Sequence, residues 1–371
     1  MKKILILAIV LSTSIAFAAH SPEEKKKKQT IKVALLLDTS NSMDGLINQA
    51  KAQLWEIVNE LSYAKYGIQK PNLEIALYEY GNSTLPMEEG YIRQVLQFSN
   101  DLDEISEQLF SLTTNGGQEY CGAAIQTSLQ ELSWGKNKDD LRLLFIAGNE
   151  PFTQGKINYE EAIADAKEKD VVINTIYCGS YSTGVAGMWK HGADIGGGDY
   201  MTINHNKKII HIVTPYDTEI LILNKQLNDT YIFYGNKGYQ KYASQQKQDL
   251  NAETLEAPVA VKRTITKSTR LYDNSSWDLV DAVNKGSVAI EKVDKSKLPK
   301  VLQDTTTEEL KKIISKQSRK RKEIQAKIKE LDKKRRKFVN EKQKSGAKKD
   351  ELNSVLIQAI KRQAKLKNYS W

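Results

Sequence analysis

Three short oxygen-bearing side chains alternate in one loop of the sequence, namely Asp38, Ser40 and Ser42. The loop follows the apolar residues 31–37, a run typical of a buried strand, and an amphipathic helical pattern comes after it. Carboxylate and hydroxyl oxygens are the ligands that hard divalent cations prefer, and alternate positions of a tight loop can converge on one ion. The loop is therefore a candidate metal site.

Helix capping is the alternative interpretation of the same loop. Asp38 and Ser40 are both well suited to cap the helix that follows. Capping uses one acceptor, however, and does not account for three acceptors in alternation. The position of the loop favours binding, because open α/β sheets bind their ligands at the carboxyl ends of the strands.

The strand, the D-x-S-x-S loop and the helix resemble the start of a von Willebrand factor A domain. The loop corresponds to the first part of the metal-ion-dependent adhesion site (MIDAS) of that family. The resemblance extends over about residues 30–205, with strand patterns at residues 72–80, 91–98, 141–146, 171–177 and 200–203 and helical patterns at residues 101–112 and 159–169. Strands that alternate with helices at this spacing predict a Rossmann-like α/β fold, with a mostly parallel sheet covered on both faces.

Two further loops of the family complete the metal site, and here both differ from the family pattern. The second loop, residues 113–119, contains two glycines, and Gln118 or Glu119 would replace the usual Thr or Asp. In the third loop, Gly148 stands where the family has an Asp. The resemblance thus implies an incomplete site that binds Mg²⁺ or Ca²⁺ weakly, with the candidate ligands Asp38, Ser40, Ser42, Gln118 and Glu119.

The first residues of the chain have the pattern of a secretory signal peptide. Basic residues 2–3, apolar residues 4–10 and the small-residue exit 16–18 predict a signal over residues 1–18. Residues 19–30 are then a polar tether. No later apolar run is long enough to cross a bilayer, so we expect an exported chain, periplasmic or secreted.

Export makes a disulfide permissible between the only two cysteines, Cys121 and Cys178. Cys121 follows the second loop, and Cys178 ends the predicted strand 171–177. Because parallel strands bring their carboxyl ends to one edge of a sheet, we predict that the two cysteines form a bridge. The alternative is a pair of small core residues that are not joined.

The end of the chain differs in composition from the rest. Residues 305–371 contain 22 Lys and Arg against 8 Asp and Glu, a net charge of +14 in a chain whose total is +9. Apolar residues recur there at helical spacing in two stripes, separated by Gly346. We therefore expect a basic amphipathic hairpin or coiled coil over residues 301–371, independent of the sheet domain of residues 31–205. Residues 206–300 form a mainly helical connection.

These features favour a binding protein over an enzyme. No G-x-S-x-G, P-loop or H-E-x-x-H motif occurs in the sequence. The resemblance implies a metal-dependent protein–protein interaction in which the partner offers a carboxylate. The alternative is a structural envelope protein with a degenerate metal site, whose basic tail contacts anionic surfaces. Nucleic acid is not an expected partner, because the predicted export separates the chain from it.

Overall fold

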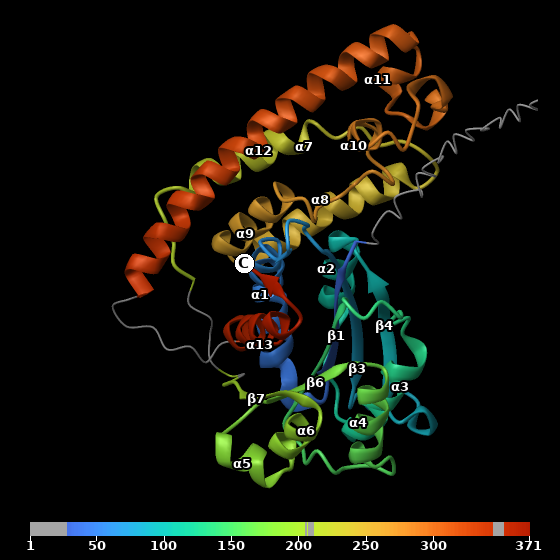
Figure 1. The fold of residues 1–371 in the computed structure, drawn as a ribbon. Helices are drawn as coiled ribbons and strands as arrows, with labels where there is room; N and C mark the ends of the chain where they lie inside the picture. The colour runs from blue at the N-terminus through green and yellow to red at the C-terminus, as the bar shows by residue number, and fades with distance from the viewer. Residues whose placement is uncertain (1–27, 205, 207–210, 344–351) are drawn as a thin grey trace, which may run out of the picture.

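The computed structural model of this chain describes residues 28–204, 206, 211–343 and 352–371. Its centre is a six-stranded sheet in the order β4-β3-β1-β5-β6-β7 (Figure 1). The strands are β1 (Thr30–Asp38), β3 (Asn72–Tyr80), β4 (Ile92–Ser99), β5 (Leu141–Gly148), β6 (Val172–Tyr177) and β7 (Gly197–Thr202). Only β4 runs antiparallel to its neighbour, which confirms the mostly parallel α/β sheet that the sequence predicted.

Helices cover both faces of the sheet. One face carries α1 (Asp44–Leu61) and α2 (Leu102–Ser111), and the other carries α3 (Cys121–Glu131), α4 (Tyr159–Glu168) and α6 (Trp189–Ile195). Strand β1 shows why two layers are needed: Val33 and Leu37 join the core under α1, while Ala34 and Leu36 join the core under α3. A strand that is apolar on both sides must be covered on both sides.

The next helices along the chain are α7 (Asp217–Asn228), α8 (Gly238–Leu255), α9 (Ala257–Lys267), α10 (Leu279–Asn284) and α11 (Lys300–Gln303). Of these, α8 and α9 pack directly onto the first helical layer of the sheet. Helix α9 contacts α1, and α8 contacts α2. Ser106 of α2 donates to Gln248 of α8 at 2.9 Å, a buried hydrogen bond between the two regions.

The two basic helices have different neighbours. Helix α12 (Thr307–Gln343) packs on α7, α9 and α10, and it runs far beyond the sheet in Figure 1. Helix α13 (Leu352–Leu366) lies against α1 and β7 instead. This arrangement differs from the expected hairpin, in which the two helices would pack mainly on each other.

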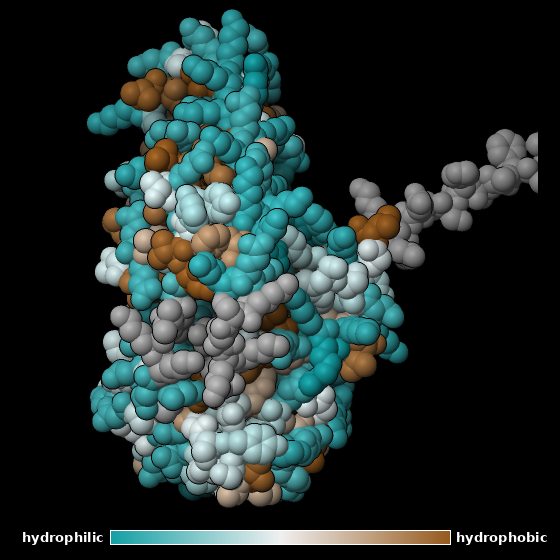
Figure 2. All heavy atoms as spheres, turned by 90° about the vertical axis from the view of Figure 1, so that its left-hand side faces the viewer, coloured by the Kyte–Doolittle hydropathy of each residue, from teal (hydrophilic) through white to brown (hydrophobic). Residues whose placement is uncertain are grey.

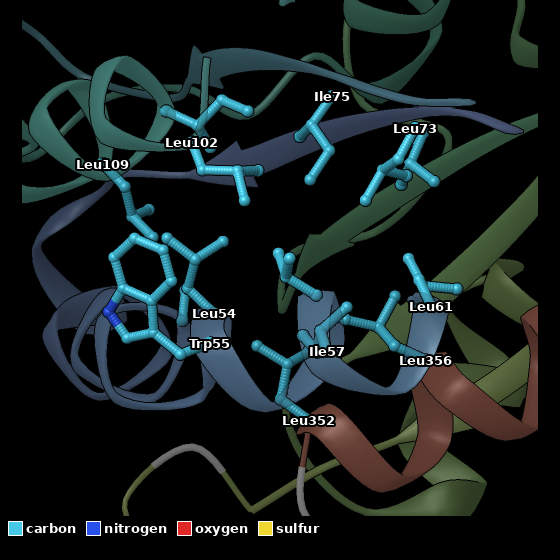
Figure 3. Packing of buried hydrophobic residues seen from close by; sticks show 14 of the residues in the cluster. Leu54, Trp55, Ile57, Leu61, Leu73, Ile75, Leu102, Leu109, Leu352 and Leu356 are labelled. Atoms are coloured by element: carbon cyan, nitrogen blue, oxygen red, sulfur yellow. The ribbon is translucent and has the colours of Figure 1, made fainter. Parts of the chain in front are cut away.

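Helix α13 belongs to the core of the sheet domain. Leu352 and Leu356 approach Ile57 and Leu61 of α1 (Figure 3) and are at most 3% exposed. The chain then ends in β8 (Tyr369–Ser370), which pairs antiparallel with β2 (Lys65–Tyr66). These contacts contradict the prediction that the tail is independent of the sheet domain.

The predicted signal peptide and most of the predicted tether lie outside the described residues. Within the described parts of the chain, no helix is both long and apolar enough to cross a membrane.

Candidate metal site at the carboxyl edge of the sheet

Asp38 is the last residue of β1 and is fully buried. Its Oδ1 accepts a hydrogen bond from the backbone N–H of Ser40 at 2.8 Å, while its Oδ2 is buried without a partner among the described residues. Burial, together with the negative charges of Glu119 and Glu150, raises the pKa of Asp38 to about 7, although the hydrogen bonds from Ser40 lower it. An unpaired buried carboxylate is costly, so a cation at Oδ2 would stabilise it.

The two serines of the motif lie together beside Asp38. The hydroxyl oxygens of Ser40 and Ser42 are 3.5 Å apart, and Asn149 donates from its Nδ2 to Ser42 Oγ at 3.1 Å. Asn115, from the second loop, donates its backbone N–H to the Thr39 carbonyl at 2.9 Å. The first and second loops are therefore fixed relative to each other, as a shared binding site requires.

The second loop brings Glu119, and not Gln118, toward Asp38. A Cβ placed on Gly81 would lie 2.8 Å from Glu119 Cγ and 3.0 Å from Asp38 Oδ1, so both side chains border this glycine. Burial and the charge of Glu150 raise the pKa of Glu119, while a hydrogen bond from Ser40 lowers it. Gln118 is exposed, and its Oε1 accepts a hydrogen bond from Tyr120. Of the two alternatives, only Glu119 is close to the first loop.

Tyr80 occupies the space next to Gly148, where the sequence lacks the family's third-loop Asp. The Tyr80 hydroxyl donates to the Ala147 carbonyl at 2.9 Å. A Cβ on Gly148 would lie 2.5 Å from that hydroxyl oxygen and 3.0 Å from Asp38 Oδ2. A side chain at residue 148 therefore requires Tyr80 to move. No pattern in the sequence marks Tyr80, because its place depends on the register that pairs it with Asp38.

Gly148→Ala tests this relation between Gly148 and Tyr80. We expect the free energy of unfolding to fall by about 1–3 kcal/mol, as for other overpacked cores. The same substitution in a Tyr80→Phe background should cost less, because the closer of the two opposing oxygens is gone and only Asp38 Oδ2 remains. Urea unfolding of the four proteins of this double-mutant cycle measures the difference. An equal cost in both backgrounds would show that the Tyr80 hydroxyl is not the obstacle.

The site is open to solvent on its outer side. Asn41, Ser42 and Asn115 are exposed, whereas Asp38 and Ser40 are buried beneath them. The described parts of the chain contain no cluster of three or more His, Cys, Asp or Glu side chains that could hold a metal. Any cation here would therefore depend on hydroxyl oxygens and retained waters as well as on carboxylates, which suits a hard ion such as Mg²⁺ or Ca²⁺.

The two cysteines are both free and buried, which contradicts the predicted disulfide. Cys121 belongs to the core under α3, and Cys178 belongs to the core under α1, on the opposite face of the sheet. Both follow the carboxyl edge, as expected, but their side chains enter different layers. Burial raises the pKa of each thiol, which favours the neutral form of both side chains.

Comparison with known proteins gives the following matches. No curated protein matches the chain. Similar solved structures include the SpRpn10 VWA domain and the conserved hypothetical protein BatB from Bacteroides thetaiotaomicron. Each is 17% identical to this chain, with a TM-score of 0.35. Both alignments cover 47% of this chain, and they cover 87% of the SpRpn10 domain and 90% of BatB. Another is proximal thread matrix protein 1 from the mussel byssus with a zinc-occupied MIDAS motif, at 14% identity and a TM-score of 0.34.

The last of these alignments covers 48% of this chain and 44% of the matrix protein, so the chain spans less than half of that relative's length. The family description of the von Willebrand factor type A domain matches residues 32–185. This range contains β3, β4, β5 and β6 of the sheet, most of β1, and all three loops of the candidate site. Residues 32–185 are therefore a von Willebrand factor type A domain.

Proposed function

We propose that this protein is an exported binding module that holds a divalent cation at the carboxyl edge of its sheet. The observation that carries the proposal is the buried Oδ2 of Asp38, which has no hydrogen-bond partner among the described residues and lies beside two serine hydroxyls. Domains of this family generally act in protein–protein interactions, which agrees with a binding role.

Asp38, Ser40, Ser42 and Glu119 would hold the cation in this proposal. The bound Mg²⁺ or Ca²⁺ would supply a positive position that accepts a carboxylate from a protein partner. Because Ser42 and its neighbour Asn41 are exposed, a partner can reach this edge without displacing a helix. Gly148 offers no third-loop carboxylate, so we expect weaker binding than in a complete site.

We propose binding without catalysis at this edge. The nearby sulfur and phenol groups are held in their neutral forms, since burial raises the pKa values of Cys121 and Tyr80. Neither group has a histidine within the hydrogen bonds described for it. A nucleophile needs an adjacent base or a lowered pKa, and these groups have neither.

Calorimetric titration with Mg²⁺ and Ca²⁺ tests the cation site. We expect binding in about the millimolar range, and a higher melting temperature when the cation is present. Asp38→Asn should abolish both effects, because it keeps the side chain's size and removes its charge. Asp229→Ala, which removes an exposed carboxylate elsewhere, is the matched control. Absence of heat and of a melting shift at millimolar cation would leave Asp38 only its hydrogen bond with the Ser40 backbone.

The second candidate is a structural envelope protein whose basic helices contact anionic surfaces. The observation that favours it is Gly148, which has no side chain to offer a metal and is bordered by Tyr80. In that case the melting temperature would not respond to divalent cations, and binding to anionic matrices would be the main activity.

A further inference from the structure

A cavity of about 880 Å³ lies at the C-terminal end of α1, whereas the candidate metal site lies before the start of that helix. It is bordered by Ser62 and Tyr63 after α1, by residues that follow α9, and by one face of α12. Helix α1 begins near the metal site and ends at this cavity. Its 18 residues span about 27 Å, so the two sites are separate.

Lysines line the cavity on two sides. Lys329, Lys333 and Lys337 project at intervals of one helical turn from α12, and Lys70 comes from the loop before β3. All four are exposed, and no ion pair within the described residues involves any of them. The face of the molecule that carries α12 is mostly hydrophilic, with only scattered apolar side chains (Figure 2).

Two acidic residues, Asp332 and the exposed Glu341, line the cavity beside five Lys and Arg side chains and Arg270, and Asp332 already has partners. Asp332 accepts a hydrogen bond from the Tyr63 hydroxyl at 3.0 Å and is buried. Arg336 stacks on the Tyr63 ring at 4.4 Å and pairs with Glu60 at 3.3 Å. These contacts hold the cavity wall together but leave the lysines around it uncompensated.

Arg270 lies in the same cavity, and part of its guanidinium group is unpaired. Its Nε and Nη2 are buried and have no hydrogen-bond partner in the described structure. Burial lowers the pKa of Arg270, because desolvation disfavours its charged form. Buried donor atoms without partners cost stability, and an anion that pairs with Nε and Nη2 would remove this penalty.

We propose that this cavity binds a ligand with clustered phosphate groups. The fork of a guanidinium matches two oxygens of one phosphate, while ammonium groups act as point charges toward others. A single carboxylate could pair with Arg270 but would leave Lys329, Lys333 and Lys337 uncompensated. The volume suits a small organic ligand or a lipid headgroup, both of which can carry such phosphates.

Titration of the full chain with tripolyphosphate tests the proposal. We expect saturable binding and a rise in melting temperature. Arg270→Met and Lys333→Gln should each weaken binding by about tenfold or more, since hydrogen bonds to charged groups contribute at least that factor. Lys320→Gln removes the same charge from the same helix outside the cavity and should have little effect. Without the ligand, Arg270→Met should melt no lower than the wild type.

A second arm separates the two sources of phosphate. Flotation with vesicles of phosphatidylcholine, with and without phosphatidylglycerol, tests a headgroup ligand in the same variants. Binding in either arm that depends on Arg270 and Lys333 but not on Lys320 supports the cavity. Equal losses in Lys333→Gln and Lys320→Gln would indicate general charge attraction and would overturn the proposal, as would failure to bind in both arms. The metal site is tested independently through Asp38.

Discussion

Deletion of residues 352–371 is expected to destabilise the whole sheet domain, although this segment follows it by almost 150 residues in the sequence. The deletion removes Leu352, Leu356 and Ile360 from the core, and all three are at most 3% exposed. Truncating one large buried aliphatic side chain commonly costs about 2–5 kcal/mol. Losing three exceeds about 5 kcal/mol, which is comparable to the total stability of many domains.

Urea unfolding followed by circular dichroism measures this effect. A matched pair of point variants separates packing from simple shortening of the chain. Leu356→Ala should lower the free energy of unfolding by about 2–5 kcal/mol, whereas Leu366→Ala, on the same helix but 81% exposed, should have little effect. If the shortened protein keeps its stability and its response to cations, the tail is independent of the domain, as the sequence suggested.

The sequence predicted the sheet well because each strand carries its own signal. The run of residues 72–80 coincides with β3, and residues 141–146 lie within β5. Strands that are apolar on both faces are recognisable locally, since a parallel sheet needs such runs. The two stripes of the tail were also recognisable, but periodicity identifies an apolar face without identifying what covers it. The partner of Leu356 therefore came only from the structure.

The same distinction applies to the candidate site. Asp38, Ser40 and Ser42 lie within one loop, so their proximity follows from the chain itself. Tyr80 enters the site through its register with Asp38, which no local pattern specifies. The predicted disulfide rested on the two cysteines following the same edge of the sheet, and it left out which face of the sheet each side chain enters. Side chains alternate between the faces of a strand, and this alternation gives Tyr177 and Cys178 to different cores.

A buried ionic network joins the helical region to the sheet domain, and Asp249 is at its centre. Arg263 donates from Nε to Asp249 at 2.6 Å and from Nη1 to Asp103 of α2 at 2.8 Å. Lys267 donates to Asp249 at 2.9 Å, and Asn224 donates to it at 3.0 Å. Arg263 and Lys267 are at most 1% exposed, so their charges depend on these partners.

Asp249→Asn is expected to lower the free energy of unfolding by about 3–5 kcal/mol at neutral pH, because it leaves Lys267 buried without a carboxylate. Thermal and urea unfolding measure the loss. Asp273→Ala, which breaks the more exposed pair with Lys285, is the control and should cost about 1 kcal/mol or less. Similar losses in the two variants would mean that the buried network contributes no more than a surface ion pair.

Acidification should distinguish this network from packing. Burial alone would raise the pKa of Asp249, but the charges of Lys267 and Arg263 outweigh it and hold the pKa well below its usual value. The stabilisation by ionised Asp249 is therefore fully present above the unfolded-state pKa, about 4, and is lost as the pH falls toward the folded-state pKa. As the pH falls below about 4, the free energy of unfolding of the wild type should approach that of Asp249→Asn. If the difference between the two proteins does not change with pH, the loss in Asp249→Asn comes from altered shape and not from the lost charge.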